Sequence, residues 1–385
     1  MVIRYITLAV PALPRAAAGG HSFNKKGQVL FEMTFASFGC ALDVFDAPDK
    51  LALKLAYLDA LREGRVQADI ARDPYDLLQA ALDGAAGLVT VGKLELEAWM
   101  TPRPALAAAG EVVVPLYREF LDTGGCAIVS ARVREFVRER VLPLTPFMIG
   151  VDHSLTGGVL DAICGPDLQE MALVVLDSHF DAIPSQVRRA AAAEAGGTAE
   201  PGNEEPEPES YNCGTWIASV ISRGLVAPSN IVVIGPSDRP GDAGGLEAEG
   251  RAMAAFRDTY AAFESDGVRV IGKHRVREVG AAEAAREAVQ GLNARSIYLS
   301  VDADIGAGEQ VKAVRFLDTI GLEPREVVRL CGSIAVEAAA RGVELAGFDV
   351  MEIDVHLADI PGSGDRTIEM CAAAAREIMA GSTAG

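Results

Sequence analysis

The chain has 385 residues, of which 50% are hydrophobic and 23% are charged. This balance excludes global disorder, because it provides enough apolar surface for a large core. Lys and Arg number 35 against 54 Asp and Glu, which gives a formal net charge of −19 at pH 7. A chain this acidic repels phosphate backbones and anionic lipid surfaces, so we expect no nucleic-acid partner and no membrane partner.

The first part of the chain, residues 1–140, carries no recognisable chemical motif. Residues 3–10 fit a first buried strand better than a signal peptide, because prolines interrupt the stretch that follows. Residues 50–64 and 74–84 have the spacing of amphipathic helices. We therefore treat residues 1–140 as a divergent N-terminal part of a single α/β domain that covers residues 1–385.

The rest of the chain alternates short apolar runs with helix-like stretches. The predicted strands are residues 147–151, 171–176, 230–234, 268–271, 296–301 and 347–353. The clearest helices are residues 281–292, 324–341 and 367–379. Apolar runs without alternation are typical of parallel strands buried on both faces, so we predict a three-layer α-β-α fold with a mainly parallel central sheet.

Residues 191–210 interrupt this pattern. They contain six Glu and three Pro and no basic residue, so we predict an acidic flexible insertion in place of a core element.

Cysteine usage and hydropathy indicate the compartment. The six Cys lack CxxC spacing, which argues against a disulfide scaffold or a zinc ribbon and suits a reducing environment. No stretch approaches the roughly 18 apolar residues of a membrane span. We predict a cytoplasmic protein.

Three short acidic segments follow predicted strands directly. They are GVDHS at 150–154, DSHFD at 177–181 and SVDAD at 300–304, and they hold two of the chain's five His. In extended backbone, residues two apart project to the same side, and ligands bind at the carboxyl edge of a parallel sheet. One such segment alone is more often a capped polar loop, but three in this context favour a metal site.

The candidate metal ligands are two imidazoles and four carboxylates. They are His153, Asp177, His179, Asp181, Asp302 and Asp304. Carboxylates that converge in this way repel one another unless a cation lies between them. The set exceeds the needs of one ion and suits two dications about 3.5–4 Å apart. Because it is rich in oxygen, we predict two Mn(II) ions per chain, with Ni or another divalent metal left open.

These segments resemble the signatures of the arginase/agmatinase (ureohydrolase) family. GVDHS is similar to its GGDHS, with Val151 in place of a Gly; DSHFD is similar to DAHxD, and SVDAD to SxDxD. A fourth segment, DVMEID at 349–354, is similar to the family's D-x-x-E-V-N. The four occur in family order and cover about residues 140–380.

The resemblance implies roles for the candidate ligands. Asp177 and Asp302 would bridge the two metals. His153 and Asp181 would complete one site, and His179 and Asp304 the other.

The resemblance also implies catalytic roles. A metal-bridging hydroxide would attack the planar carbon of a guanidinium or amidine, and Asp181 would accept a hydrogen bond from it. Glu352 would hold the cationic nitrogen atoms of the substrate, since a carboxylate pairs with a planar guanidinium through two hydrogen bonds.

The sequence departs from the family pattern at several positions. In YNCGT at 211–215, Cys213 replaces a His that serves as a proton shuttle, and we leave open whether Cys213 lines the pocket or acts as an acid or base. His274 and His356 are candidate substitutes. Residues 305–310 (IGAGEQ) replace a loop that begins Asp-Pro, and Asp354 stands where Asn is common.

The resemblance thus implies a binuclear metal-dependent hydrolase of a C–N bond in a small cationic guanidino or amidino compound, with agmatine-like substrates first. The residue at position 213 motivates an alternative, a formimidoylglutamase-like amidine hydrolase. The altered loop motivates another, a non-catalytic binding or assembly protein with this fold. Family members are commonly trimers or hexamers, so we expect a homo-oligomer.

Overall fold

The computed structural model describes residues 22–23, 29–30, 33–66, 70–164, 170–183, 211–240, 251–318, 320–358, 360 and 362–383. The chain divides into two compact units, Met1–Met33 and Thr34–Gly385. In the first unit, β1 (Ser22–Phe23) pairs antiparallel with β2 (Val29–Leu30). The strand expected at 3–10 and the acidic insertion expected at 191–210 lie outside the described residues.

The described residues of the second unit form an eight-stranded sheet in the order β4-β3-β5-β10-β9-β6-β7-β8. Every neighbouring pair is parallel. The strands are β3 (Phe35–Cys40), β4 (Leu88–Lys93), β5 (Thr145–Gly150), β6 (Met171–Leu176), β7 (Ile231–Ile234), β8 (Arg269–Ile271), β9 (Ser296–Asp302) and β10 (Glu344–Met351). The predicted mainly parallel sheet is confirmed.

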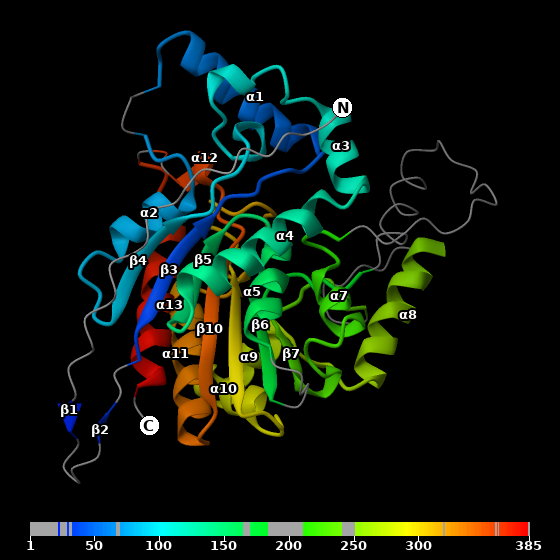
Figure 1. Ribbon diagram of the computed structural model, residues 1–385. Coiled ribbons are helices and arrows are strands. Elements are labelled where there is room, and N and C mark those ends of the chain that lie inside the picture. Colours follow the sequence, from blue (N-terminus) through cyan, green and yellow to red (C-terminus); the bar gives the residue numbers. More distant parts are fainter. Residues whose placement is uncertain are drawn as a thin grey trace. The chain divides into compact units, whose positions relative to one another are not determined.

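Helices cover both faces of the sheet, which confirms the predicted three layers. One row runs through neighbouring helices α2 (Pro74–Ala81), α13 (Thr367–Ser382), α11 (Pro324–Ala340), α10 (Ala281–Val289) and α9 (Lys273–Val279). The other row runs through α3 (Val114–Asp122), α4 (Gly125–Phe136), α5 (Thr156–Ile163) and α7 (Trp216–Ser222). Figure 1 shows α4 and α5 in front of the strands and α11 and α13 behind them.

The remaining helices lie outside these two rows. They are α1 (Pro48–Arg62), α8 (Arg251–Ser265) and the short α12 (Val355–Ala358). In the described part of the chain, no helix combines the length and the apolar character that crossing a bilayer requires.

The central strands form because their residues can be buried on both faces. All six residues of β6 (MALVVL) and all four of β7 (IVVI) are buried. Burying one Leu or Val side chain contributes about 1.5–3 kcal/mol, so each strand of this kind stabilises the sheet strongly. The predicted strands agree with the observed ones to within a few residues at each end.

Two strands carry too weak a signal to be predicted. In β3 (FASFGC), Ser37 and Gly39 interrupt the apolar run, yet the whole strand is buried. Ser37 Oγ donates to Gln79 Oε1 on α2 at 2.8 Å, and a Cβ at Gly39 would lie 2.7 Å from the Tyr75 side chain. The small residues thus let α2 approach the strand. β4 is an edge strand, and its residues are partly or fully exposed, so it lacks the pattern of a core strand.

The four central strands carry the predicted motifs. β5, β10, β9 and β6 are neighbours in the sheet and run in the same direction. The register sets Asp349 of β10 opposite Ser300 of β9, and Ser300 opposite Val175 of β6. The four strands therefore end at one edge, where parallel α/β sheets bind their ligands.

Candidate metal centre

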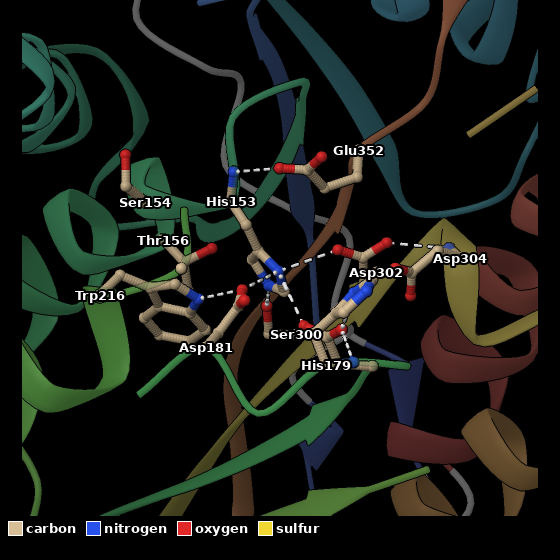
Figure 2. A network of polar contacts seen from close by, with 12 residues as sticks. His153, Ser154, Thr156, His179, Asp181, Trp216, Ser300, Asp302, Asp304 and Glu352 are labelled. Carbon is tan, nitrogen blue, oxygen red and sulfur yellow. Dashed lines mark hydrogen bonds and ion pairs between the residues drawn. The ribbon is translucent and has the colours of Figure 1, made fainter. Parts of the chain in front are cut away.

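His153 follows β5 directly and lies at the centre of the predicted cluster. The Asp152 carboxylate accepts a hydrogen bond from Ser154 N at 3.1 Å, which starts the single helical turn His153–Leu155. This turn bends the chain over the end of the sheet. His153 Nδ1 lies 3.1 Å from Asp302 Oδ2 and 3.2 Å from an oxygen of both Asp177 and Asp181. Figure 2 shows Asp181 and Asp302 beside the ring.

A second group of ligands lies beside the first. His179 Nδ1 is 2.8 Å from Asp304 Oδ2 and 3.7 Å from Asp177 Oδ1. Asp177 belongs to both groups, since the possible ligand atoms of His153, Asp177 and Asp181, and those of Asp177, His179 and Asp304, lie within 4.8 Å of one another in each set. These two groups hold five of the six predicted ligands, and the sixth, Asp302, lies 3.1 Å from His153 Nδ1, so the structure brings all six together.

Several ligand atoms in this cluster are buried without a hydrogen-bond partner. They are His153 Nδ1, Asp177 Oδ2 and Asp304 Oδ2. An unpaired buried acceptor costs about 1–3 kcal/mol, and more when it is charged, whereas a divalent cation satisfies several such atoms at once. Imidazole nitrogen and carboxylate oxygen are ordinary ligands of Mn(II) and related ions, so the residues present fit a pair of metal ions.

Backbone amides hold the acids in place. Asp177 Oδ1 accepts from His179 N at 2.7 Å, and Asp302 Oδ1 accepts from Asp304 N at 2.8 Å. Asp304 Oδ1 accepts from Ser178 N at 2.9 Å. In each case one carboxylate oxygen is fixed by the backbone, and the other is left for a ligand.

Asp181 has an unusual backbone conformation, with φ of 51°. Non-glycine residues seldom adopt positive φ, and when they do the strain is often found at functional sites. Trp216 Nε1, at the start of α7, donates to Asp181 Oδ2 at 2.9 Å. The hydrogen bond and the backbone together turn the carboxylate towards His153 (Figure 2).

A buried network behind His153 selects its tautomer. Ser300 Oγ donates to Asp349 Oδ1 at 2.7 Å and lies 2.8 Å from His153 Nε2. Because the hydroxyl hydrogen is directed to Asp349, Ser300 Oγ accepts from Nε2–H, which leaves Nδ1 facing the acids. Tyr298 and Thr156 also donate to Asp349, at 2.8 and 2.7 Å. Partners of this kind orient metal-binding histidines.

The acids also alter proton binding. Burial alone would lower the pKa of His153, but the adjacent carboxylates of Asp177, Asp181 and Asp302 raise it well above its usual value. Burial raises the pKa of Asp302 well above its usual range and that of Asp181 to about 7. Without metal, the cluster therefore retains protons that a metal ion must displace.

This competition predicts a pH dependence of metal stabilisation. In the unfolded chain His153 has a pKa of about 6.5, and in the metal-free folded protein its pKa is higher. The protonated ring therefore stabilises the metal-free fold at pH values below about 6.5, and this stabilisation is lost as the pH rises through the pKa of the folded state. Metal needs the neutral ring, so its binding strengthens over the same range. We expect the difference in melting temperature between Mn(II)-loaded and metal-free protein to widen from about pH 6 to pH 9. A gap that narrows with rising pH would contradict this.

Glu352, predicted to hold the substrate, lies next to the cluster. It follows β10 with φ of 62°, and its Oε1 accepts from His153 N at 3.0 Å (Figure 2). Its second neighbour is Arg315, whose Nη1 donates to Glu352 Oε1 at 3.3 Å and to Asp152 Oδ2 at 3.0 Å. Burial alone would lower the pKa of Arg315, but Glu352 and Asp152 raise it well above its usual value, so the side chain stays charged.

The other predicted residues have clear positions. Cys213 is buried, and burial, with Asp152 and Glu352, raises the pKa of its thiol well above the usual value, so the thiol stays protonated near neutral pH. This favours a pocket-lining side chain over a base. His274 is exposed on α9, and His356 Nε2 lies 2.8 Å from the Pro102 carbonyl. Neither histidine joins the two ligand groups described above.

Some residues of the site were given no role by the sequence. Asp152, Ser178, Ser300 and Asp349 lie inside the recognised motifs, so their position was a usable signal. Two others, Trp216 and Arg315, lie outside the four family-like segments. Trp216 follows YNCGT directly, and Arg315 is a single basic residue in a segment without a motif.

The family model described as Arginase family matches residues 85–381. Among solved structures, proclavaminate amidino hydrolase from Streptomyces clavuligerus is 20% identical, with 91% of this chain and 92% of that chain covered and a TM-score of 0.52. Agmatine ureohydrolase of Thermoplasma volcanium is 18% identical, with coverages of 91% and 90% and a TM-score of 0.52. Formimidoylglutamase from Bacillus subtilis is 13% identical, with 96% of each chain covered and a TM-score of 0.56. A comparison with curated proteins gives no match.

Proposed function

Since the chain belongs to the arginase family, as its motifs predicted, we propose that it is a binuclear metal-dependent hydrolase that cleaves a C–N bond of a guanidino or amidino compound. The solved structures with this fold are named for several different substrates. The observation that carries the proposal is the cluster itself, in which four carboxylates and two imidazoles from three strand ends gather with buried unpaired ligand atoms.

In this proposal His153, Asp177, Asp181 and Asp302 hold one metal ion, and Asp177, His179, Asp302 and Asp304 hold the other. Two dications bound there would lower the pKa of a water molecule so that hydroxide is available near neutral pH. We take both ions as Mn(II).

The protein's own groups position the reaction. Asp181, fixed by Trp216, would orient the attacking oxygen. Glu352 Oε2, buried without a hydrogen-bond partner, would accept an N–H of the substrate. Cys213 would line the pocket as a neutral thiol.

A second candidate is an amidine hydrolase that releases formamide. It is favoured by the absence of an imidazole at position 213, where a protonated thiol stands instead. A guanidine substrate would instead release urea. A cytoplasmic location and a homo-oligomer, trimeric or hexameric, stay predictions.

The test combines metal content with product identity. Purified protein loaded with Mn(II) should hold close to two metal ions per chain by elemental analysis. A panel of guanidines and amidines, scored for urea, ammonia and formamide, should then identify the substrate group. Metal content near zero after loading would contradict the metal centre. Full metal content with no product from any compound would favour the alternative of a non-catalytic binding protein.

A further inference from the structure

The guanidinium of Arg315 already lies against the carboxylate that the proposed function assigns to the substrate. Arg315 comes from the segment between η6 (Ala303–Gly306) and α11, the part that departs from the family pattern. Its side chain is only 2% exposed. Nη1 contacts Glu352 Oε1 at 3.3 Å and Asp152 Oδ2 at 3.0 Å. The Arg315 guanidinium and any substrate held by Glu352 would therefore contact the same carboxylate.

The surroundings fix this guanidinium in position. The rings of Phe45 and Phe316 lie 5.2 and 5.5 Å from Cζ, close enough for cation–π attraction. Nε lies 3.4 Å from Asp43 Oδ1, and Arg315 N donates to Glu352 O at 2.8 Å. Arg315 is therefore held at the site through both its backbone and its side chain.

The same segment has a second anchor close by. Asp318 Oδ2 accepts from Lys273 Nζ at 2.7 Å, and Lys273 Nζ also donates to Ser178 Oγ at 2.6 Å. Ser178 lies between the ligands Asp177 and His179. The segment that carries Arg315 is thus connected through Lys273 to the loop that holds Asp177 and His179.

Unpaired atoms remain on both sides of this contact. Arg315 Nη2 and Nε, and Glu352 Oε2, are buried without a hydrogen-bond partner. A guanidinium offers donors only, so Nη2 can pair with an oxygen acceptor of a ligand but not with another cation. A substrate whose second group is an ammonium would leave Nη2 unpaired and would place like charges together, which weakens binding.

We propose that Arg315 determines specificity: the amidino or guanidino group donates to Glu352 Oε2, and an oxygen acceptor elsewhere in the substrate binds the Arg315 guanidinium. The inference rests on the proposed function and narrows its substrate class. The expected substrates are then compounds with a carboxylate or amide tail, and agmatine-like compounds with a cationic tail are disfavoured.

Three guanidines of matched length test this with the Mn(II)-loaded full chain. Agmatine ends in an amine, 4-guanidinobutyrate in a carboxylate and 4-guanidinobutyramide in an amide. Dissociation constants by calorimetry and kcat/KM by urea release give the preference of an oxygen tail over the amine. For the wild type we expect the compounds with an oxygen tail to be preferred over agmatine by at least about tenfold. If charge dominates, this preference is larger for the carboxylate than for the amide.

Variants assign the preference to Arg315. Arg315→Gln should lower it by about tenfold or more, and Arg315→Lys, which keeps the charge, should lower it less. Arg118→Gln, at a side chain 65% exposed, is the surface control and should leave it unchanged. If Arg315→Gln does not fold, Arg315→Lys decides, because an unchanged preference in that variant would overturn the inference.

The readouts separate the two proposals. If the wild type favours agmatine, or if Arg315→Gln leaves the preference unchanged, the role of Arg315 is overturned while the hydrolase stands. If none of the three guanidines is turned over but the binding preference follows the variants, hydrolysis of guanidines fails and the role of Arg315 stands. If none of the three compounds binds, the role of Arg315 is overturned, and the wider panel of amidines decides whether the chain is a hydrolase.

Discussion

An Asp177→Asn variant should lose tight metal binding and at least about 10³-fold in kcat/KM, because metal ions contribute several kcal/mol to transition-state stabilisation. Asp177 is shared by both ligand groups, so its loss affects both ions. The amide has nearly the same shape as the acid but offers no charge, and its nitrogen cannot bind a cation. Elemental analysis after Mn(II) loading and kcat/KM on the best compound of the panel measure the two effects.

The matched control is Asp161→Asn. Asp161 also lies in ion pairs, with Arg134 at 3.3 Å and with Arg223, but it stands on α5 and contributes to neither ligand group. We expect this control to retain its metal and its activity. Circular dichroism should show that both variants are folded. Near-normal metal content in Asp177→Asn would contradict its assignment as a shared ligand.

The candidate site could be predicted from the sequence because its signal is local. Each motif lies at the carboxyl end of a buried strand: Asp177 directly follows β6, and Asp302 is the last residue of β9. Parallel strands bring such ends to one edge whatever the sequence between them. His153, Asp177 and Asp302 could therefore be grouped although they are far apart in the chain.

The rest depends on contacts that no local pattern encodes. The burial of β3 depends on α2 packing against Ser37 and Gly39, which look like turn residues in the sequence. Arg315 reads as a surface residue, since arginine is almost never fully buried unless it is paired. Its partners Asp152 and Glu352 lie just after β5 and β10, and only the fold brings the three together.

Asp349, in the network behind His153, is expected to affect metal binding strongly although it is not a candidate ligand. Asp349 is fully buried and accepts hydrogen bonds from three hydroxyl groups, those of Ser300, Tyr298 and Thr156. Through Ser300 it directs Nε2–H of His153 away from the candidate metal site. In the Asp349→Ala variant, Ser300 Oγ is free to donate to His153 Nε2, which allows the tautomer with its proton on Nδ1.

We expect Asp349→Ala to weaken metal binding about 10- to 100-fold and to lower the free energy of unfolding by about 1–3 kcal/mol for each donor that stays unpaired. Tyr298→Phe is the matched comparison, because it removes one donor to Asp349 and leaves Ser300 in place. It should cost stability but little metal affinity. Metal titration and chemical denaturation of the metal-free proteins measure the two quantities separately. Equal losses of metal affinity in the two variants would show that Asp349 supports the fold and does not position His153.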